Sequence, residues 1–132
     1  MELIKNYGTT DIKISDDSLF EFGVWGEDDP YVYVHLANPN YSGKIVVPYK
    51  CNINGVEKRV GLVYSGFLSY SKVTKVIFPK DIGFEANCLN HSSLQKIPNK
   101  YINEYEIFAD TQISSVSDYN QINYASRAFA GC

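Results

Sequence analysis

The sequence predicts a β-rich α/β fold in which an N-terminal meander or cap of antiparallel strands precedes a short solenoid with a ladder of parallel strands. Aromatic residues make up 14% of the chain and eleven of them are Tyr, a residue that suits half-buried strands. Apolar and polar residues alternate in residues 1–60, whereas residues 61–132 repeat a short apolar motif. The 132 residues fit a single domain, 1–132, in which we expect helices of a single turn or so.

Residues 1–60 carry the strand and turn signals of an antiparallel meander. Alternating runs lie at residues 12–14, 19–25 and 31–36. Pro follows each of the last two runs, together with Asp after the first and Asn after the second, which is typical of turns. Asn54 and Gly55 lie between two further apolar segments, and an Asn-Gly pair is the strongest short-range signal for a hairpin. We therefore expect consecutive strands in this region to pair with one another.

Residues 61–132 contain short apolar pairs that recur at nearly constant spacing. The pairs are Val73/Val76, Leu94/Ile97 and Ile113/Val116, and their first members lie 21 and 19 residues apart. The segments before the first two pairs, residues 66–73 and 87–94, also align without a gap. A period of roughly 20–29 residues with one short strand per unit is typical of a leucine-rich-repeat solenoid. We expect about three such units, the last incomplete.

The repeat resembles that of the BspA-like leucine-rich-repeat family, whose unit runs approximately as I-x-x-x-A-F-x-x-C-x-x-L-x-x-V-x-I-P. Residues 128–132 (Ala-Phe-Ala-Gly-Cys) match its A-F-x-x-C element, and residues 73–79 match its strand element. Residues 41–48 and 54–60 resemble the β-hairpin cap with which many members begin. The family Cys is replaced by Tyr70 and His91 in the first two units, and the family Phe by Cys88 in the second. The resemblance implies a solenoid that binds proteins or other cells.

The charges are unevenly distributed along the chain. Residues 1–43 hold eight acidic and two basic residues, net −6, and residues 44–132 hold ten basic and seven acidic residues, net +3. The pI near 5.3 argues against a dedicated nucleic-acid binder. No apolar run approaches the roughly 20 residues that span a bilayer, so no membrane association is expected. Without a signal peptide the expected location is cytoplasmic, or the cell surface or outside if the sequence lacks its natural start.

The sequence contains no recognisable catalytic motif. Cys88 and His91 have C-x-x-H spacing, but a structural zinc site needs four ligands, and these positions serve packing in the repeat. Three Cys form no disulfide framework. Sequence neighbours such as Asp16 and Asp17 point to opposite faces of a strand, which argues against paired catalytic carboxylates. We therefore expect a chain that is not an enzyme and needs no cofactor or metal.

The strand face of the repeats is the first candidate binding site. Side chains on either side of the central Val of each strand should point away from the core, because side chains alternate across a strand. These residues are Lys75 and Ile77 in the first unit, Lys96 and Pro98 in the second, and Ser115 and Ser117 in the third. We expect Lys75 and Lys96 to be neighbours on adjacent strands. The predicted function is a non-catalytic interaction module that binds a protein, or else a glycan, through this face.

Two alternatives use other parts of the chain. The first is a small intracellular inhibitor, of the kind that phages encode, that acts through its acidic N-terminal region with Glu27, Asp28 and Asp29. The second is a structural unit that assembles with copies of itself. Phe129 begins a unit whose strand is missing, so we expect either a monomer with a folded-back end or a weak homodimer.

Overall fold

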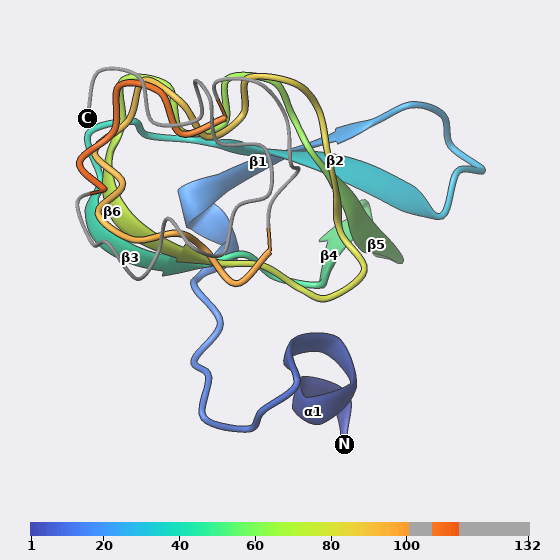
Figure 1. The fold of residues 1–132 in the computed structure, drawn as a ribbon. Coiled ribbons are helices and arrows are strands. Elements are labelled where there is room, and N and C mark those ends of the chain that lie inside the picture. Colours follow the sequence, from blue (N-terminus) through green and yellow to red (C-terminus); the bar gives the residue numbers. More distant parts are fainter. Residues whose placement is uncertain (101–106, 114–132) are drawn as a thin grey trace.

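The computed structural model describes residues 1–100 and 107–113, and it confirms a β-rich fold with few helices. Figure 1 shows the strands grouped above a short N-terminal helix that stands apart from them. The helical elements are α1 (Glu2–Tyr7) and the 3₁₀ turn η1 (Asp17–Leu19). The strands are β1 (Phe20–Val24), β2 (Tyr31–Leu36), β3 (Ser42–Val46), β4 (Lys50–Ile53), β5 (Val56–Val63), β6 (Lys72–Ile77) and β7 (Gly83–Phe84).

The strands form two sheets that combine antiparallel and parallel pairs. The larger sheet has the order β1-β2-β5-β4, with β7 also paired to β5, and the smaller sheet pairs β3 with β6. The pairs β1–β2 and β4–β5 are antiparallel, whereas β2–β5, β5–β7 and β3–β6 are parallel. The chain therefore contains antiparallel hairpins and parallel strands. The parallel pairs are not the predicted ladder, however: residues 73–76 lie in β6, which pairs with β3, and residues 94–97 form no regular element.

The prediction of a continuous antiparallel meander over residues 1–60 is wrong at β3. Strand β2 pairs with β5 and not with β3, which leaves the larger sheet and pairs with β6. Ile45 and Val46 are both buried, although side chains on consecutive strand residues point to opposite faces. A strand that is buried on both faces is typical of parallel pairing, which explains why β3 lies beside β6. Residues 12–14, expected as a strand, form no regular element.

The predicted hairpin turn is confirmed. Asn54 and Gly55 connect β4 to β5 with φ angles of 53° and 84°. A two-residue turn with positive φ at both positions is type I′, whose twist matches that of the flanking strands. The register that pairs Ile53 with Val56 follows directly from this turn.

The main core lies between the sheets and the turns that follow β5. One row of inward residues crosses four strands, since Phe22 pairs with Val34, Val34 with Val63 and Val63 with Phe84. All four belong to the main core or pack against it. The sequence neighbours of these residues point to the opposite face of the larger sheet, because side chains alternate along a strand, and they form a second, outward row.

A second, smaller core joins α1 to the sheets. Tyr7, Val46 and Tyr49 are its buried members. The Tyr7 hydroxyl donates a hydrogen bond of 2.6 Å to the carbonyl oxygen of Val47, and the Tyr7 and Tyr49 rings meet edge to face at 6.1 Å. Because α1 has only six residues, these tertiary contacts rather than helix propensity hold it in place.

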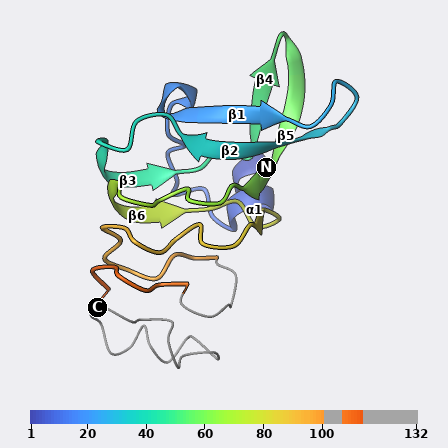
Figure 2. The ribbon, with the colours of Figure 1, turned by 90° about the horizontal axis from the view of Figure 1, so that it is seen from above.

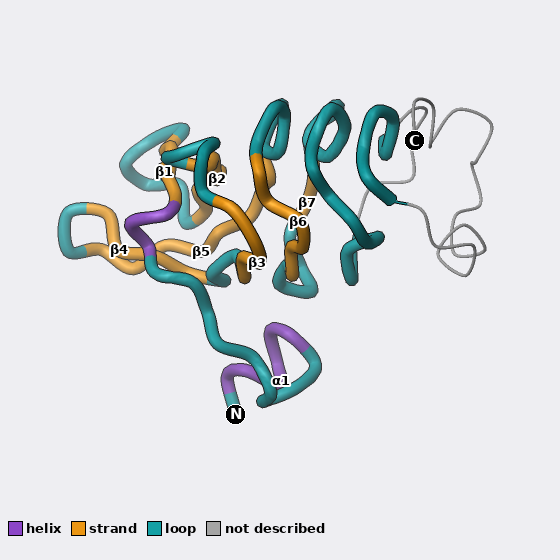
Figure 3. Tube along the Cα trace, turned by 90° about the vertical axis from the view of Figure 1, so that its left-hand side faces the viewer, coloured by secondary structure: helices purple, strands orange, loops and turns teal. Residues whose placement is uncertain are grey.

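Beyond β5 the chain forms successive turns that lie side by side (Figures 2 and 3). Backbone hydrogen bonds connect each turn to the next, from Gly66 N to Asn87 O (3.1 Å), from Leu68 N to Cys88 O (2.9 Å) and from Ser92 N to Asp110 O (3.1 Å). These bonds agree with the alignment of residues 66–73 with 87–94. Equivalent buried residues are Phe67, Cys88 and Ile107; Leu68, Leu89 and Phe108; and Val73, Leu94 and Ile113.

Each turn also repeats the same unusual backbone conformation. Tyr70, His91 and Asp110 occupy equivalent positions and have φ angles of 59°, 52° and 54°. The Tyr70 and His91 rings stack at 6.1 Å with 12° between their planes, and His91 Nδ1 lies 3.2 Å from Asp110 Oδ2. Side-chain contacts between these three positions thus run along the outside of the stacked turns.

Candidate interaction surface

Lys75 and Lys96 are exposed, as expected for residues of an outward face. In the β3–β6 pair the register partner of Lys75 is Lys44. On the other side of β6, Gln95 N donates a 2.9 Å hydrogen bond to Thr74 O, so the segment with Lys96 runs beside this strand. Lys75 therefore lies between another Lys and a polar segment, and like charges on adjacent strands are mildly destabilising.

Ile77 and Pro98 do not lie on the open face that the sequence predicts. Ile77 is half-buried and packs against the second core, which α1 covers. Pro98 is buried. The prediction assumes that one face of every repeat strand is solvated, but strands of a parallel pair can be buried on both faces. Ser115, Ser117 and the predicted dimer residue Phe129 lie outside the described residues.

The acidic loop between β1 and β2 carries the other predicted site residues. Glu27 and Asp28 are exposed, whereas Asp29 is half-buried and its Oδ1 accepts a hydrogen bond from Tyr31 N at 2.9 Å. Lys58 reaches under this loop, and its ammonium group donates to the carbonyl oxygens of Glu27 at 2.8 Å and Asp29 at 2.6 Å. The loop is therefore fixed to β5 through its backbone, which leaves the Glu27 and Asp28 carboxylates directed to solvent.

An aromatic surface, formed by Trp25, Tyr33, His35 and Tyr64, covers the outward face of the larger sheet. The ring centroids of Trp25 and Tyr33 lie 5.1 Å apart, those of Tyr33 and Tyr64 4.8 Å, and those of His35 and Tyr64 4.3 Å. Trp25 is 53% exposed and the other three side chains are half-buried. These four connected rings at the surface offer apolar area together with polar ring edges and hydroxyls, a combination enriched at interfaces.

Glycines beneath the rings allow them to lie flat on the sheet. A Cβ atom at Gly23 would be 2.0 Å from Cζ of Tyr33, and one at Gly61 would be 2.8 Å from Cδ1 of Tyr31. Both distances are below van der Waals contact, so any larger residue must displace the ring. Tyr31 is itself 51% exposed and extends the apolar surface beside the acidic loop.

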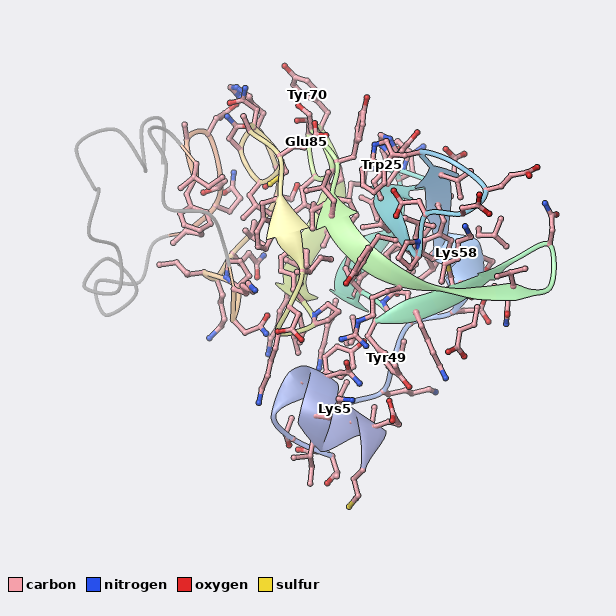
Figure 4. All side chains as sticks on the ribbon, turned by 90° about the vertical axis from the view of Figure 1, so that its right-hand side faces the viewer. Lys5, Trp25, Tyr49, Lys58, Tyr70 and Glu85 are labelled. Atoms are coloured by element: carbon pink, nitrogen blue, oxygen red, sulfur yellow. The ribbon has the colours of Figure 1, made fainter. Side chains whose placement is uncertain are left out.

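Two carboxylates lie at the ends of an outward row on this face. Glu21 of β1 is the register partner of His35 in β2, and Tyr64 N donates to Val34 O at 3.2 Å, which places Tyr64 next along the row. Glu85 N donates to Val63 O at 2.9 Å. Glu85, the residue after Phe84, is therefore the neighbour of Tyr64 on the side away from β2. The order across the four strands is thus Glu21, His35, Tyr64, Glu85. Figure 4 shows Glu85, Trp25 and Tyr70 along one edge of the molecule, opposite Lys5 of α1.

This surface is not among the predicted sites, although part of its signal is present in the sequence. In residues 31–35, Tyr, Tyr and His alternate with two Val, so the outward face of β2 is aromatic rather than charged. Taken alone, the alternation indicates only a strand. The contributions of Trp25, Tyr64 and Glu85 depend on the pairing of β1, β5 and β7, which no local pattern specifies.

A shallow pocket of about 410 Å³ lies between the acidic loop and the turn that connects β4 to β5. Its lining includes Val24 and Val56, which are 44% and 57% exposed, and Glu27 of the acidic loop. Val24 is the register partner of the buried Val32, so this pocket lies on the opposite face of the larger sheet from the aromatic surface.

Two observations describe the chemistry of the titratable and sulfur-bearing groups among the described residues. No group of three or more His, Cys, Asp or Glu side chains that could hold a metal ion occurs among residues 1–100 and 107–113. Burial raises the pKa of the Cys51 thiol to about 11, with Asp17 adding to the shift, so this thiol is protonated at neutral pH. A protonated, buried thiol is a poor nucleophile.

Comparisons with known proteins give no further assignment: no family model, no curated protein and no solved structure matches this chain. Among the helices within the described ranges, none has the length and apolar character needed to cross a bilayer.

Proposed function

We propose that the protein is a non-catalytic interaction module that binds a protein partner through the aromatic surface. The observation that carries the proposal is a connected group of four rings on the outward face of a sheet, with Trp25 exposed and the other three half-buried. Aromatic residues in such positions supply large contact area at low entropic cost. Trp and Tyr are also the residues that most often dominate the binding energy of protein interfaces.

We further propose that residues 61–132 form a short solenoid of the leucine-rich-repeat type, similar to the BspA-like family. The backbone hydrogen bonds between consecutive turns and the equivalent buried positions support this assignment. In this arrangement each turn stabilises the next, and the stacked turns hold β7, with Glu85 after it, against the larger sheet.

The aromatic surface is a better candidate than the strand face of the repeats. Ile77, which would be the apolar centre of that face, packs against the second core. The remaining exposed residues, Lys75 and Lys96, are flexible cations whose burial in an interface is costly. The acidic loop adjoins the aromatic surface through Trp25, so the inhibitor function predicted for Glu27, Asp28 and Asp29 would use the same end of the molecule.

The test is capture of partners from the source cell by the immobilised chain and three sets of variants. Trp25→Ser with Tyr31→Ser removes aromatic area at two residues that are more than half exposed, so the fold should be retained. Lys75→Glu with Lys96→Glu tests the repeat face, and Glu27→Lys with Asp28→Lys tests the acidic loop. Loss of the captured partner with the aromatic pair alone supports the proposal.

Other outcomes overturn the assignment of the surface. If only the Lys75→Glu and Lys96→Glu variant loses the captured partner, the binding site is the strand face of the repeats. If only the Glu27→Lys and Asp28→Lys variant loses it, the inhibitor function is favoured. A mass that rises with protein concentration in light scattering, and falls in the Trp25→Ser variant, would show that the aromatic surface binds a second copy and overturn a foreign partner.

A further inference from the structure

We infer that the aromatic surface binds a cationic, arginine-bearing segment of the partner protein. This inference rests on the proposed function and names the chemistry of the partner. The outward row has a carboxylate at each end, Glu21 and Glu85, with His35 and Tyr64 between them. The adjoining loop adds the exposed carboxylates of Glu27 and Asp28. Lys58, which is buried beneath this loop, donates to loop carbonyl oxygens.

Ring faces and carboxylates together favour a guanidinium group. The face of an aromatic ring carries a negative quadrupole potential that attracts a cation lying over it. A guanidinium ion stacks on such a face through its plane and also pairs with carboxylates by two parallel hydrogen bonds, which an ammonium ion does not do. The Tyr64 ring, which contacts both His35 and Tyr33, is the central platform of the row.

The geometry of the row defines the spacing of the cations. Adjacent strands are about 4.8 Å apart, so the backbone positions of Glu21 and Glu85, three strand spacings apart, are separated by roughly 14 Å. An extended peptide advances about 3.4 Å per residue, and its alternate side chains point to the same side. Residues i, i+2 and i+4 of an extended segment therefore reach Glu21, the His35 and Tyr64 rings, and Glu85. The expected ligand is a segment with the pattern Arg-x-Arg-x-Arg.

A neutral glycan and a nucleic acid fit this surface less well. A sugar ring would use the aromatic faces, but it would leave two carboxylates without opposite charge at the ends of the row. A nucleic acid would bring phosphates next to those carboxylates, and such like-charge contacts oppose binding.

Titration with short synthetic peptides tests the inference, and the chain contains its own reporter. Trp25 is the single Trp of the sequence and contacts Tyr33, so its fluorescence should report occupation of the surface. The probes are Arg-Gly-Arg-Gly-Arg, the matching Lys and Glu peptides, and a maltose oligosaccharide as a neutral glycan. We expect the Arg peptide to bind most tightly, the Lys peptide more weakly and the other two not at all. Raising the salt from about 50 to 300 mM should weaken binding, because it shortens the Debye length.

Conservative variants separate charge from ring contacts. Glu21→Gln with Glu85→Gln should weaken binding of the Arg peptide by about tenfold, because two ion pairs are lost. Asp11→Asn with Asp81→Asn removes the same charge at exposed positions outside the row and should leave binding unchanged. Tyr64→Leu should weaken binding by about fivefold, whereas Tyr64→Phe, which keeps the ring, should not.

The outcomes are distinguishable from failure of the proposed function. Equal binding of the Arg and Glu peptides, no binding of the Arg peptide, or equal loss in the two double-charge variants would each overturn the cationic ligand. If the Arg peptide does not bind but a captured partner is still lost in the Trp25→Ser and Tyr31→Ser variant, the interaction surface stands and its ligand is not cationic. Saturable binding of the oligosaccharide in place of the Arg peptide would assign the surface to glycans.

Discussion

The ammonium nitrogen of Lys58 lies 2.6 Å from the carbonyl oxygen of Asp29, in a loop that is otherwise rich in carboxylates. Lys58 is 6% exposed and also donates to the carbonyl oxygen of Glu27. This cation therefore organises the backbone of the acidic loop instead of neutralising its side chains. The conformation of the loop is therefore held by one buried residue of β5 together with the hydrogen bond from Tyr31 N to Asp29 Oδ1.

Replacing Lys58 with Met should loosen the acidic loop. The variant keeps an unbranched apolar stem but loses the donors, so we expect the free energy of unfolding to fall by about 1–3 kcal/mol. Amide hydrogen exchange in residues 26–29 should become faster than in β2. Lys50→Met, which removes an exposed ion pair with Glu57 at 3.1 Å, is the matched control and should change stability by less than about 1 kcal/mol. Unchanged exchange in the loop would contradict the role assigned to Lys58.

Gly23→Ala should disturb the aromatic surface. The new Cβ would lie 2.0 Å from Cζ of Tyr33, so the ring must move away from the sheet. We expect a loss of about 1–3 kcal/mol in stability and a change in Trp25 fluorescence, because Trp25 contacts Tyr33. Gly26→Ala is the control, since a Cβ atom at that position would have no neighbouring atom within 4 Å. If the two variants behave alike, the Tyr33 ring does not rest on Gly23.

Val76→Asp should prevent folding to a soluble protein. Val76 is 1% exposed in the main core, and an aspartate there would bury a charge without a partner. The neighbouring substitution Lys75→Asp introduces the same residue at an exposed position and should leave expression unchanged. Soluble expression with a cooperative thermal transition for Val76→Asp would show that the register of β6 is wrong.

The extent to which the sequence predicts the fold differs between local and long-range features. The Asn54–Gly55 turn, the alternation in β1 and β2 and the alignment of residues 66–73 with 87–94 depend on local chemistry, and each is visible in the sequence. The parallel contact between β2 and β5 depends on which surfaces fit together after the turns have formed. The apolar run at Ile45 and Val46 fits a hairpin by its position in the chain, although burial on both faces favours a parallel strand.

The candidate site is less predictable than the fold. Alternation places Tyr33 and His35 on one face of β2, but the ring of Tyr64 and the carboxylate of Glu85 come from strands whose pairing is long-range. The sequence pattern assigns Ile77 to an open surface, because the covering by α1 cannot be inferred from a six-residue segment. Residues of a surface built from four strands become neighbours only when the sheet order is known.

Cys51 should react slowly with alkylating reagents in the folded protein. Its side chain is 4% exposed, and burial raises the pKa of the thiol to about 11, so little thiolate is present at neutral pH. Iodoacetamide labelling followed by peptide mass spectrometry should show protection that is lost in urea. Asp17→Asn should increase the labelling rate modestly, because the Asp17 carboxylate contributes to the raised pKa. Rapid labelling of the native protein at Cys51 would contradict its placement in the core.

Stability should fall in alkaline solution because of Tyr7. Burial is the largest cause that raises the pKa of the Tyr7 hydroxyl above its ordinary value of 10.0, so the folded state holds this proton more tightly than the unfolded state does. The contribution is fully present below about pH 10, and the free energy of unfolding decreases as the pH rises beyond it, since the folded state then binds more protons. The raised pKa of the Cys51 thiol also lowers the free energy of unfolding as the pH rises, beginning at a lower pH. The measurement is therefore made in a protein that carries Cys51→Ala.

Tyr7→Phe should remove this alkaline decrease at a cost to stability near neutral pH. The variant loses the 2.6 Å hydrogen bond to the Val47 carbonyl oxygen, which should lower the free energy of unfolding by about 1 kcal/mol. Urea denaturation at several pH values between about 7 and 11 compares the two slopes. Tyr70→Phe removes a hydroxyl from a side chain that is 83% exposed and is the matched control. An equally steep alkaline decrease in Tyr7→Phe would show that the Tyr7 hydroxyl is not the buried group responsible, and that the contact between α1 and Val47 is looser than the structure indicates.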